Sequence, residues 1–216
     1  MCIRDSVTGV ANLAKIAQDH HITLIHISSD YVFDGSEEYH KETEDFSPLG
    51  VYGQTKAAAD ALVENVSQHY IIRSSWIVGE GHNFVTRMID FADRCNNGEN
   101  VNVQAPIDQV GRLTFASDLV KGIFHLLDTN AEYGTYNLTC SGKSTSWHDI
   151  AEKVFSSIGA DASKIEANLV DDYARISHGS PRPHNCSLDL SKIEATGFKP
   201  ADWEQLLENY VENHNK

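Results

Sequence analysis

The 216-residue sequence lacks the glycine-rich turn that binds the pyrophosphate of a dinucleotide. Its 14 glycines are scattered, and neither Gly-x-Gly-x-x-Gly nor Gly-x-x-Gly-x-x-Gly occurs. In α/β proteins such a turn presents backbone amides and a helix N-terminus to the phosphates. The 216 residues are therefore predicted to contain no pyrophosphate-binding turn of this kind.

Three further absences narrow the class of protein. No apolar run approaches the roughly 18 residues of a membrane-spanning helix, and the first residues contain no apolar core of a secretory signal. The four cysteines lie far apart without a Cys-x-x-Cys pair, which indicates free thiols. The 11 histidines show no His-Glu-x-x-His or comparable ligand spacing. We expect a cytoplasmic protein with no membrane role, no disulfide framework and no metal site.

Basic residues are also scarce. The chain has 17 Lys and Arg against 31 Asp and Glu, for a formal net charge of −14. Nonspecific binding to nucleic acid needs a basic surface that displaces counterions, so this class of partner is excluded. A phosphate-bearing ligand would need a local basic pocket, for which the candidates are Arg73, Arg112, Arg175 and Arg182.

The apolar residues predict alternating helices and strands. Helices are expected over residues 7–20, 55–68, 84–94 and 114–127, and strands over 23–28, 70–74, 101–103 and 134–139. This alternation predicts an α/β fold with a partial doubly wound, Rossmann-like parallel sheet. A helix capped by Ser146 and helical segments over 188–195 and 203–211 predict a small C-terminal helical lobe.

Tyr52, Lys56 and Ser29 are the candidate catalytic residues. Tyr52 and Lys56 lie four residues apart at the start of a predicted helix, so they project from one face. Ser29 follows a predicted strand, at the end where open α/β sheets bind ligands. A phenol, a cation that lowers its pKa and a hydroxyl that polarises a carbonyl suit hydride transfer to a ketone, which leaves charge on oxygen.

Six ordered segments resemble the dTDP-4-dehydrorhamnose reductases, an extended short-chain dehydrogenase/reductase family. They are residues 28–35 (SSDYVFDG), 51–56 (VYGQTK), 73–76 (RSSW), 81–84 (GHNF), 108–112 (DQVGR) and 180–183 (SPRP). The resemblance runs from about Val7 to the C-terminus, and it departs from the family pattern at Leu113, where proline is expected. It implies NADPH-dependent, or NADH-dependent, reduction of the 4-keto group of dTDP-4-dehydro-L-rhamnose to dTDP-L-rhamnose.

The resemblance also implies roles for individual residues. It implies cofactor contacts at Ser28, Tyr52, Lys56 and Ser74, with Lys56 holding the ribose as well as acidifying Tyr52. Substrate contacts are implied at Asp30, Tyr31, Trp76, Asn83, Phe84, Arg112 and Arg182. Related dehydratases have an Asp-Glu pair where this chain has Asp30 and Tyr31, which favours simple reduction over elimination. The implied partner is a dTDP-sugar, with a possible homodimer or fusion to an epimerase domain.

The resemblance predicts three parts of the chain. Residues 1–6 look unlike the family and are predicted to be a foreign leader. Residues 7–140 are predicted to form the C-terminal part of an NAD(P)-binding domain, and residues 141–216 are predicted to form the substrate-binding lobe. Since family members begin with the glycine-rich turn, we expect a truncated chain that is inactive alone and binds NADPH poorly.

Two other functions are compatible with the sequence. The regulatory subunit of methionine adenosyltransferase resembles the same fold and acts as a binding module, although the presence of Ser29, Tyr52 and Lys56 together favours the enzyme. The other alternative is a nucleotide-sugar reductase with a different base or sugar.

Overall fold

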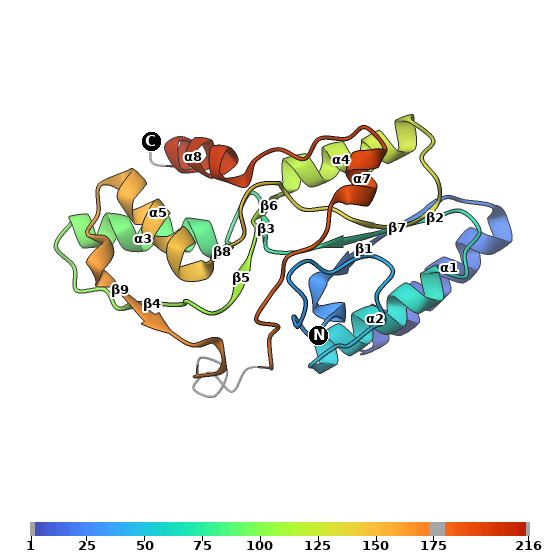
Figure 1. Ribbon diagram of the computed structural model, residues 1–216, viewed down its shortest axis with the longest axis horizontal. Helices are drawn as coiled ribbons and strands as arrows, with labels where there is room; N and C mark the ends of the chain where they lie inside the picture. Colours follow the sequence, from blue (N-terminus) through green and yellow to red (C-terminus); the bar gives the residue numbers. More distant parts are fainter. Residues whose placement is uncertain (1–2, 173–179, 215–216) are drawn as a thin grey trace.

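The computed structural model describes residues 3–172 and 180–214. Figure 1 shows two parts side by side: a three-stranded sheet between helices, and a second group of helices joined to it by short strands. The helices are α1 (Gly9–His20), α2 (Val51–Val63), α3 (Phe84–Asn96), α4 (Ala116–Asp128), α5 (Trp147–Ile158), α7 (Ser191–Ala195) and α8 (Trp203–His214). Short helical turns are η1 (Arg4–Thr8), η2 (Asp30–Val32) and η3 (Ala162–Lys164).

The main sheet is parallel, which confirms the predicted α/β class. Its strand order is β1-β2-β7, and both pairings are parallel. The strands of the chain are β1 (Leu24–Ser29), β2 (His69–Ser74), β3 (Ile77–Val78), β4 (Val103–Pro106), β5 (Val110–Gly111), β6 (Thr114–Phe115), β7 (Gly134–Asn137), β8 (Thr145–Ser146) and β9 (Ile165–Asn168). The register places Ser29 beside Ser74, so the carboxyl ends of β1 and β2 lie next to each other.

Helices cover both faces of this sheet, α1 and α2 on one side and α4 and α7 on the other (Figure 1). Fully buried Ile72 and Leu138 belong to the apolar core between the sheet and α4, together with Leu126 from α4 and Ile193 from α7. The middle strand β2 is buried from Tyr70 to Ser74, as expected for a parallel strand covered on both faces, whereas β1 is only partly buried before Ser28.

A second core holds the other half of the molecule together. It combines α3, α5 and α8 with the parallel pair β4 and β9, and includes Met88, Val154, Phe155 and Trp203. The predicted helix cap at Ser146 is confirmed, because its side chain accepts a hydrogen bond from the backbone N–H of Asp149. The lobe predicted from residue 141 onward therefore packs together with α3 and β4 from earlier in the chain.

Several element boundaries differ from those predicted. Helix α2 begins at Val51 rather than at residue 55, because Gly50 has the extended backbone of an N-cap. Helical structure at the N-terminus begins at Arg4, three residues before the predicted start, and Ser6 is buried. Strand β4 runs over 103–106, two residues beyond the expected start, with Val103 and Ala105 facing the core.

Arg73, one of the four candidates for a basic pocket, lies in a buried ion pair and is therefore withdrawn as a candidate. Its guanidinium Nε donates to Asp60 Oδ2 at 3.0 Å, and both side chains are almost fully buried. The guanidinium also lies over the rings of Phe33 and Phe46, at 5.3 and 5.0 Å from their centroids. His26 Nε2 of β1 is 3.4 Å from the second oxygen of Asp60. The group joins α2 to two strands of the sheet.

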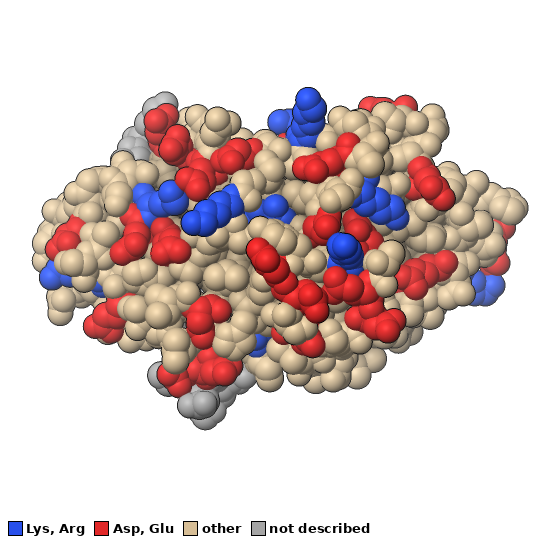
Figure 2. Space-filling model, in the orientation of Figure 1, with Lys and Arg blue, Asp and Glu red and all other residues tan. Residues whose placement is uncertain are grey.

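Surface charge and cysteine placement agree with the composition. Figure 2 shows acidic side chains spread over the visible face, with fewer basic side chains among them. Cys95, Cys140 and Cys186 are free thiols, and Cys2 lies outside the described residues. In the part of the chain that the structure describes, every helix is too short or too polar to cross a membrane.

Replacing Asp60 with alanine should destabilise the protein strongly. Removing one partner of a buried ion pair leaves an uncompensated charge, at a cost of about 3–5 kcal/mol in the free energy of unfolding. Asp90→Ala is the matched control, since Asp90 pairs with Arg94 on the exposed face of α3 and its loss should change little. Urea unfolding of both variants gives the comparison, and equal midpoints would show that the buried pair contributes nothing.

Candidate active site

A cavity of about 360 Å³ lies where β1 and β2 end. Its lining residues are Ser28, Ser29, Asp30, Tyr31, Tyr52, Ser74, Ser75, Trp76 and Ile77. Most of the residues predicted for catalysis and cofactor contact are therefore together in one place. Polar side chains at the carboxyl ends of parallel strands are the usual ligand-binding arrangement of open α/β sheets.

The serines of this cavity differ in their hydrogen bonds. Ser29 Oγ donates to Asp30 Oδ1 at 3.0 Å and accepts from the backbone N–H of Tyr31 at 3.2 Å. Ser28 Oγ and Ser74 Oγ are buried and have no hydrogen-bond partner among the described residues. Because buried hydroxyls normally have a partner, two unpaired ones in a cavity wall fit contacts to a polar ligand.

The start of α2 places Tyr52 in the cavity. Tyr52 lies in the first turn of the helix, and its ring meets the ring of Tyr31 edge-on at 5.6 Å. Gly53 makes this approach possible, because a Cβ at that position would overlap the carbonyl oxygen of Tyr31 and lie 2.9 Å from Cβ of Pro48. The turn of η2 and the start of α2 therefore touch through backbone.

Lys56 lies one turn behind Tyr52, outside the residues that line the cavity. Its Nζ donates to the carbonyl oxygen of Ile27 on β1. Partial burial lowers the pKa of Lys56, and the negative charge of Asp60 on the next turn opposes this shift. The ammonium is thus held against the sheet beside the first turn of α2.

Gly53→Ala should destabilise the protein, because the new methyl group forces the first turn of α2 away from Tyr31. Overpacking of this kind costs about 1–3 kcal/mol in the free energy of unfolding. Gly9→Ala is the control, since Gly9 is helical and a Cβ there meets only one atom, at 3.6 Å. Thermal unfolding should show a lower Tm for Gly53→Ala alone, and an unchanged Tm would contradict the close approach.

Asp30 and Tyr31 have unusual acidities. Burial raises the pKa of Asp30 to about 6, opposed by hydrogen bonds from Cys186 and Ser29. Burial also raises the pKa of Tyr31 to about 12, assisted by the neighbouring Cys186 and Asp30. Tyr31 is therefore a hydrogen-bond donor at neutral pH, while Asp30 changes charge near the physiological range.

The raised pKa of Asp30 predicts a pH-dependent stability. Between pH of about 4 and about 6, folded Asp30 keeps a proton that the unfolded chain has lost, so the free energy of unfolding falls as pH rises. With the folded pKa at about 6 against an ordinary 3.8, the fall is about 3 kcal/mol at 1.36 kcal/mol per pKa unit. Asp30→Asn should lack this fall, so its stability relative to the unmodified protein should grow across that interval. Urea unfolding at several pH values measures the free energy of unfolding of both proteins. If the two free energies changed in parallel with pH, the raised pKa of Asp30 would be contradicted.

A second pocket, of about 200 Å³, brings together two predicted substrate contacts from distant segments. It is lined by Phe84, Arg87, Gln104, Pro106, Trp147 and Arg182. Phe84 and Arg182 were predicted, whereas Arg87 and Trp147 were not. Arg87 follows Phe84 by three residues on α3, which puts both on one face, and that spacing was the available signal. Aromatic rings with two guanidinium groups suit a nucleobase and its phosphates.

Two other predicted substrate contacts have structural roles and line neither pocket. Asn83 caps α3, where its Oδ1 accepts from the N–H of Thr86 and its Nδ2 donates to Tyr210 Oη at 2.9 Å. Arg112 is buried, and its guanidinium donates to the carbonyl oxygen of Leu188 and lies over the ring of Tyr39. Burial lowers its pKa. Arg175 lies outside the described residues.

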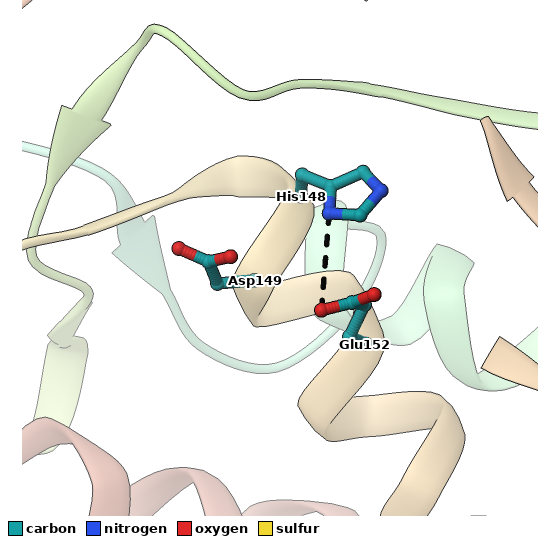
Figure 3. A group of neighbouring side chains, drawn as sticks. All are labelled: His148, Asp149 and Glu152. Atoms are coloured by element: carbon teal, nitrogen blue, oxygen red, sulfur yellow. Dashed lines mark ion pairs between the residues drawn. The ribbon is translucent and has the colours of Figure 1, made fainter. Parts of the chain in front are cut away.

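One group of side chains among the described residues has the spacing of metal ligands. His148, Asp149 and Glu152 lie in the first turns of α5, with ligand atoms within 4.8 Å of one another (Figure 3). His148 Nδ1 is 3.9 Å from a carboxylate oxygen of Glu152. Asp149 Oδ2 already accepts from Thr145 Oγ1 and the N–H of Ser146 as part of the helix cap. Capping accounts for this carboxylate, so we assign no ion here.

The fold and the cavity define the class of protein. A serine at the end of a parallel strand, facing a Tyr-x-x-x-Lys helix, is the arrangement of the short-chain dehydrogenases/reductases. The family described as RmlD substrate binding domain matches residues 5–216, and the chain belongs to it. The match begins inside the predicted leader of residues 1–6.

The relatives are reductases of deoxy sugars. The chain is 35% identical to a dTDP-4-dehydrorhamnose reductase of Aggregatibacter actinomycetemcomitans, over 94% of this chain and 71% of the relative. It is 32% identical to a dTDP-4-keto-6-deoxy-D-glucose reductase of Streptomyces niveus, over 89% of this chain and 65% of the relative. A crystal structure of dTDP-4-dehydrorhamnose reductase from Bacillus anthracis in complex with NADP superposes with a TM-score of 0.85 at 28% identity, covering 96% of this chain and 72% of that one. The chain thus spans 65–72% of the length of these proteins.

Proposed function

We propose that this chain carries the catalytic and substrate-binding residues of an NADPH-dependent reductase that converts dTDP-4-dehydro-L-rhamnose to dTDP-L-rhamnose. The observation that carries the proposal is the cavity that Ser29 and Tyr52 both line, with Lys56 one turn behind Tyr52 on α2. The relatives named as reductases, one of them in complex with NADP, support the reaction and the cofactor. The cytoplasmic location belongs to the same proposal, and the homodimer and the epimerase fusion stay predictions.

Tyr52, Ser29 and Lys56 each have a task in reducing a ketone. NADPH, when bound, supplies the hydride that adds to the carbonyl carbon. Negative charge then develops on the carbonyl oxygen, and the hydroxyl of Tyr52 donates a proton to it. Ser29 Oγ donates a hydrogen bond to the same oxygen, which requires its proton to turn away from Asp30. Once Tyr52 has donated its proton it is a phenolate, and the Lys56 ammonium stabilises that negative charge.

The cofactor fits the polar wall of this cavity. The unpaired hydroxyls of Ser28 and Ser74 can bind its amide and ribose groups, and the Lys56 ammonium can bind its ribose. Lys56 would exchange its present bond to the Ile27 carbonyl for this one. The 216 residues contain no glycine-rich turn for the pyrophosphate, so an activity assay needs a protein that supplies one.

The second pocket is the proposed site for the nucleotide end of the substrate. Phe84 and Trp147 offer ring faces for the base, and Arg87 and Arg182 offer positive charge for the diphosphate. Because the protein has a net charge of −14, a phosphate-bearing ligand needs a local basic pocket. Arg87 and Arg182 supply that pocket.

A second candidate function differs only in the sugar. The Streptomyces niveus relative is named for dTDP-4-keto-6-deoxy-D-glucose, at an identity close to that of the rhamnose enzymes. Both sugars carry a ketone and the same nucleotide, so the same cavity residues serve either. Comparing kcat/KM for the two substrates decides between them, and a higher value for the glucose derivative would replace the rhamnose assignment.

Tyr52→Phe should abolish most turnover while leaving ligand binding intact. The assay uses a chimeric protein in which the part of the Aggregatibacter reductase that this chain does not match is joined to residues 7–216. Removing the proton donor should lower kcat by roughly 10²–10⁴-fold, the span of general acid catalysis. Affinity for dTDP should stay within about twofold, because the pocket of Arg182 is untouched.

Tyr133→Phe is the matched control, since Tyr133 is exposed near the opposite end of β7. Its kcat should equal that of the unmodified chimera. Near-normal turnover by Tyr52→Phe would make the tyrosine structural and would favour the alternative of a non-catalytic binding module.

A further inference from the structure

The two pockets of the proposed site are joined by stacked aromatic rings. Trp76, which lines the cavity of Tyr52, stacks on Trp147 with ring centroids 3.9 Å apart and an interplanar angle of 21°. Trp147 lines the arginine-containing pocket, where it also contacts Phe84 with centroids 4.4 Å apart. The ring of Trp147 therefore contacts Trp76, the residue that lines the cavity of Tyr52.

Trp76 depends on its neighbours for its position. Its backbone is left-handed, with φ of 47°, a conformation that side chains of its size rarely adopt. On one side its ring lies against Gly111, where an added Cβ would be 3.0 Å from the indole. On another it lies against Trp147. A bulky residue in a strained backbone persists only when the surrounding structure determines it.

Trp147, in contrast, is held by its own helix. It is the first residue of α5 and lies between the two members of the capping box, Ser146 and Asp149. The same helix packs its apolar face, with Ile150 and Val154, into the second core. Its backbone is therefore fixed, while its ring lines the arginine-containing pocket and stacks on Trp76 of the other cavity.

We propose that Trp147 is a positioning residue that couples occupation of the arginine-lined pocket to the placement of Trp76 beside the reacting ketone. The proposal rests on the proposed function, because it takes a nucleoside diphosphate as the occupant of that pocket. A base or phosphate that packs against Trp147 and Phe84 restricts the Trp147 ring, and through the stack it restricts Trp76. Binding energy from the non-reacting end of the substrate then orients the reacting end.

A spectroscopic test uses the chain as it is. Two stacked indoles couple their electronic transitions, so the unmodified protein should show an exciton-split circular dichroism signal that Trp147→Phe lacks. Adding dTDP should change this signal with the same saturation curve as dTDP binding measured by calorimetry. Phe124→Leu, which removes an exposed aromatic ring on α4, should behave like the unmodified protein.

The outcomes of this test separate the inference from the function on which it rests. Binding of dTDP without any change in the exciton signal would overturn the coupling and leave the nucleotide pocket in place. Absence of dTDP binding would overturn the proposed nucleotide site and the inference with it.

Kinetics of the chimeric protein test the consequence for catalysis. Trp147→Leu should lower kcat by about 10–100-fold, because misplacement of groups around the reacting ketone is costly. Its dTDP affinity should fall only about 2–10-fold, the value of one aromatic contact. Trp147→Phe, which keeps a ring in the stack, should recover most of kcat. Equal losses in kcat and in dTDP affinity, or no rescue by phenylalanine, would show that Trp147 is merely a binding or packing residue.

Discussion

The parallel pairing of β1 with β2 is the constraint on which the candidate site depends. Its register sets Ser28 beside Arg73 and Ser29 beside Ser74, so two strand ends present polar side chains to one cavity. Strand β2 is buried from Tyr70 to Ser74, and the carboxyl end of β1 is buried at Ser28 and Ser29. A shift of the β1 register by one residue would turn the side chains of Ser28 and Ser29 to the opposite faces of the sheet and displace both from their places in the cavity wall.

Helix α2 supplies the other half of the site through two contacts of different kinds. At its start, Gly53 lets the backbone touch Tyr31, and this brings Tyr52 to the strand ends. Two turns further, Asp60 forms the buried pair with Arg73 of β2. Lys56 lies between Gly53 and Asp60 on the helix, and its ammonium donates to the carbonyl oxygen of Ile27 on β1. The same pair that stabilises the fold therefore sets the charge environment of Lys56.

Features that depend on residues close together in the sequence could be predicted, whereas features that depend on contacts between distant segments could not. The Tyr52–Lys56 spacing and the strand-end serine are local patterns, and the structure has Ser29 and Tyr52 in one cavity wall with Lys56 one turn behind. Their catalytic roles stay a prediction. Arg73 was misread because a sequence shows a charge but not the Asp60 that neutralises it. The pocket of Phe84, Trp147 and Arg182 joins three distant segments, so no local pattern could predict it. Arg182 and Phe84 came from resemblance alone, and Trp147 and Arg87 were missed.

The proposed reaction is hydride transfer, within this cavity, to the 4-keto carbon of a dTDP-sugar. The most direct test gives the chimeric protein NADPH that carries deuterium at the transferable position of the nicotinamide, and follows the sugar product by NMR. The account predicts deuterium on C4 of the deoxy sugar, formed at a rate that depends on Tyr52. A C4 proton in place of deuterium, or no reduction of the ketone by a folded protein that binds both ligands, would contradict it.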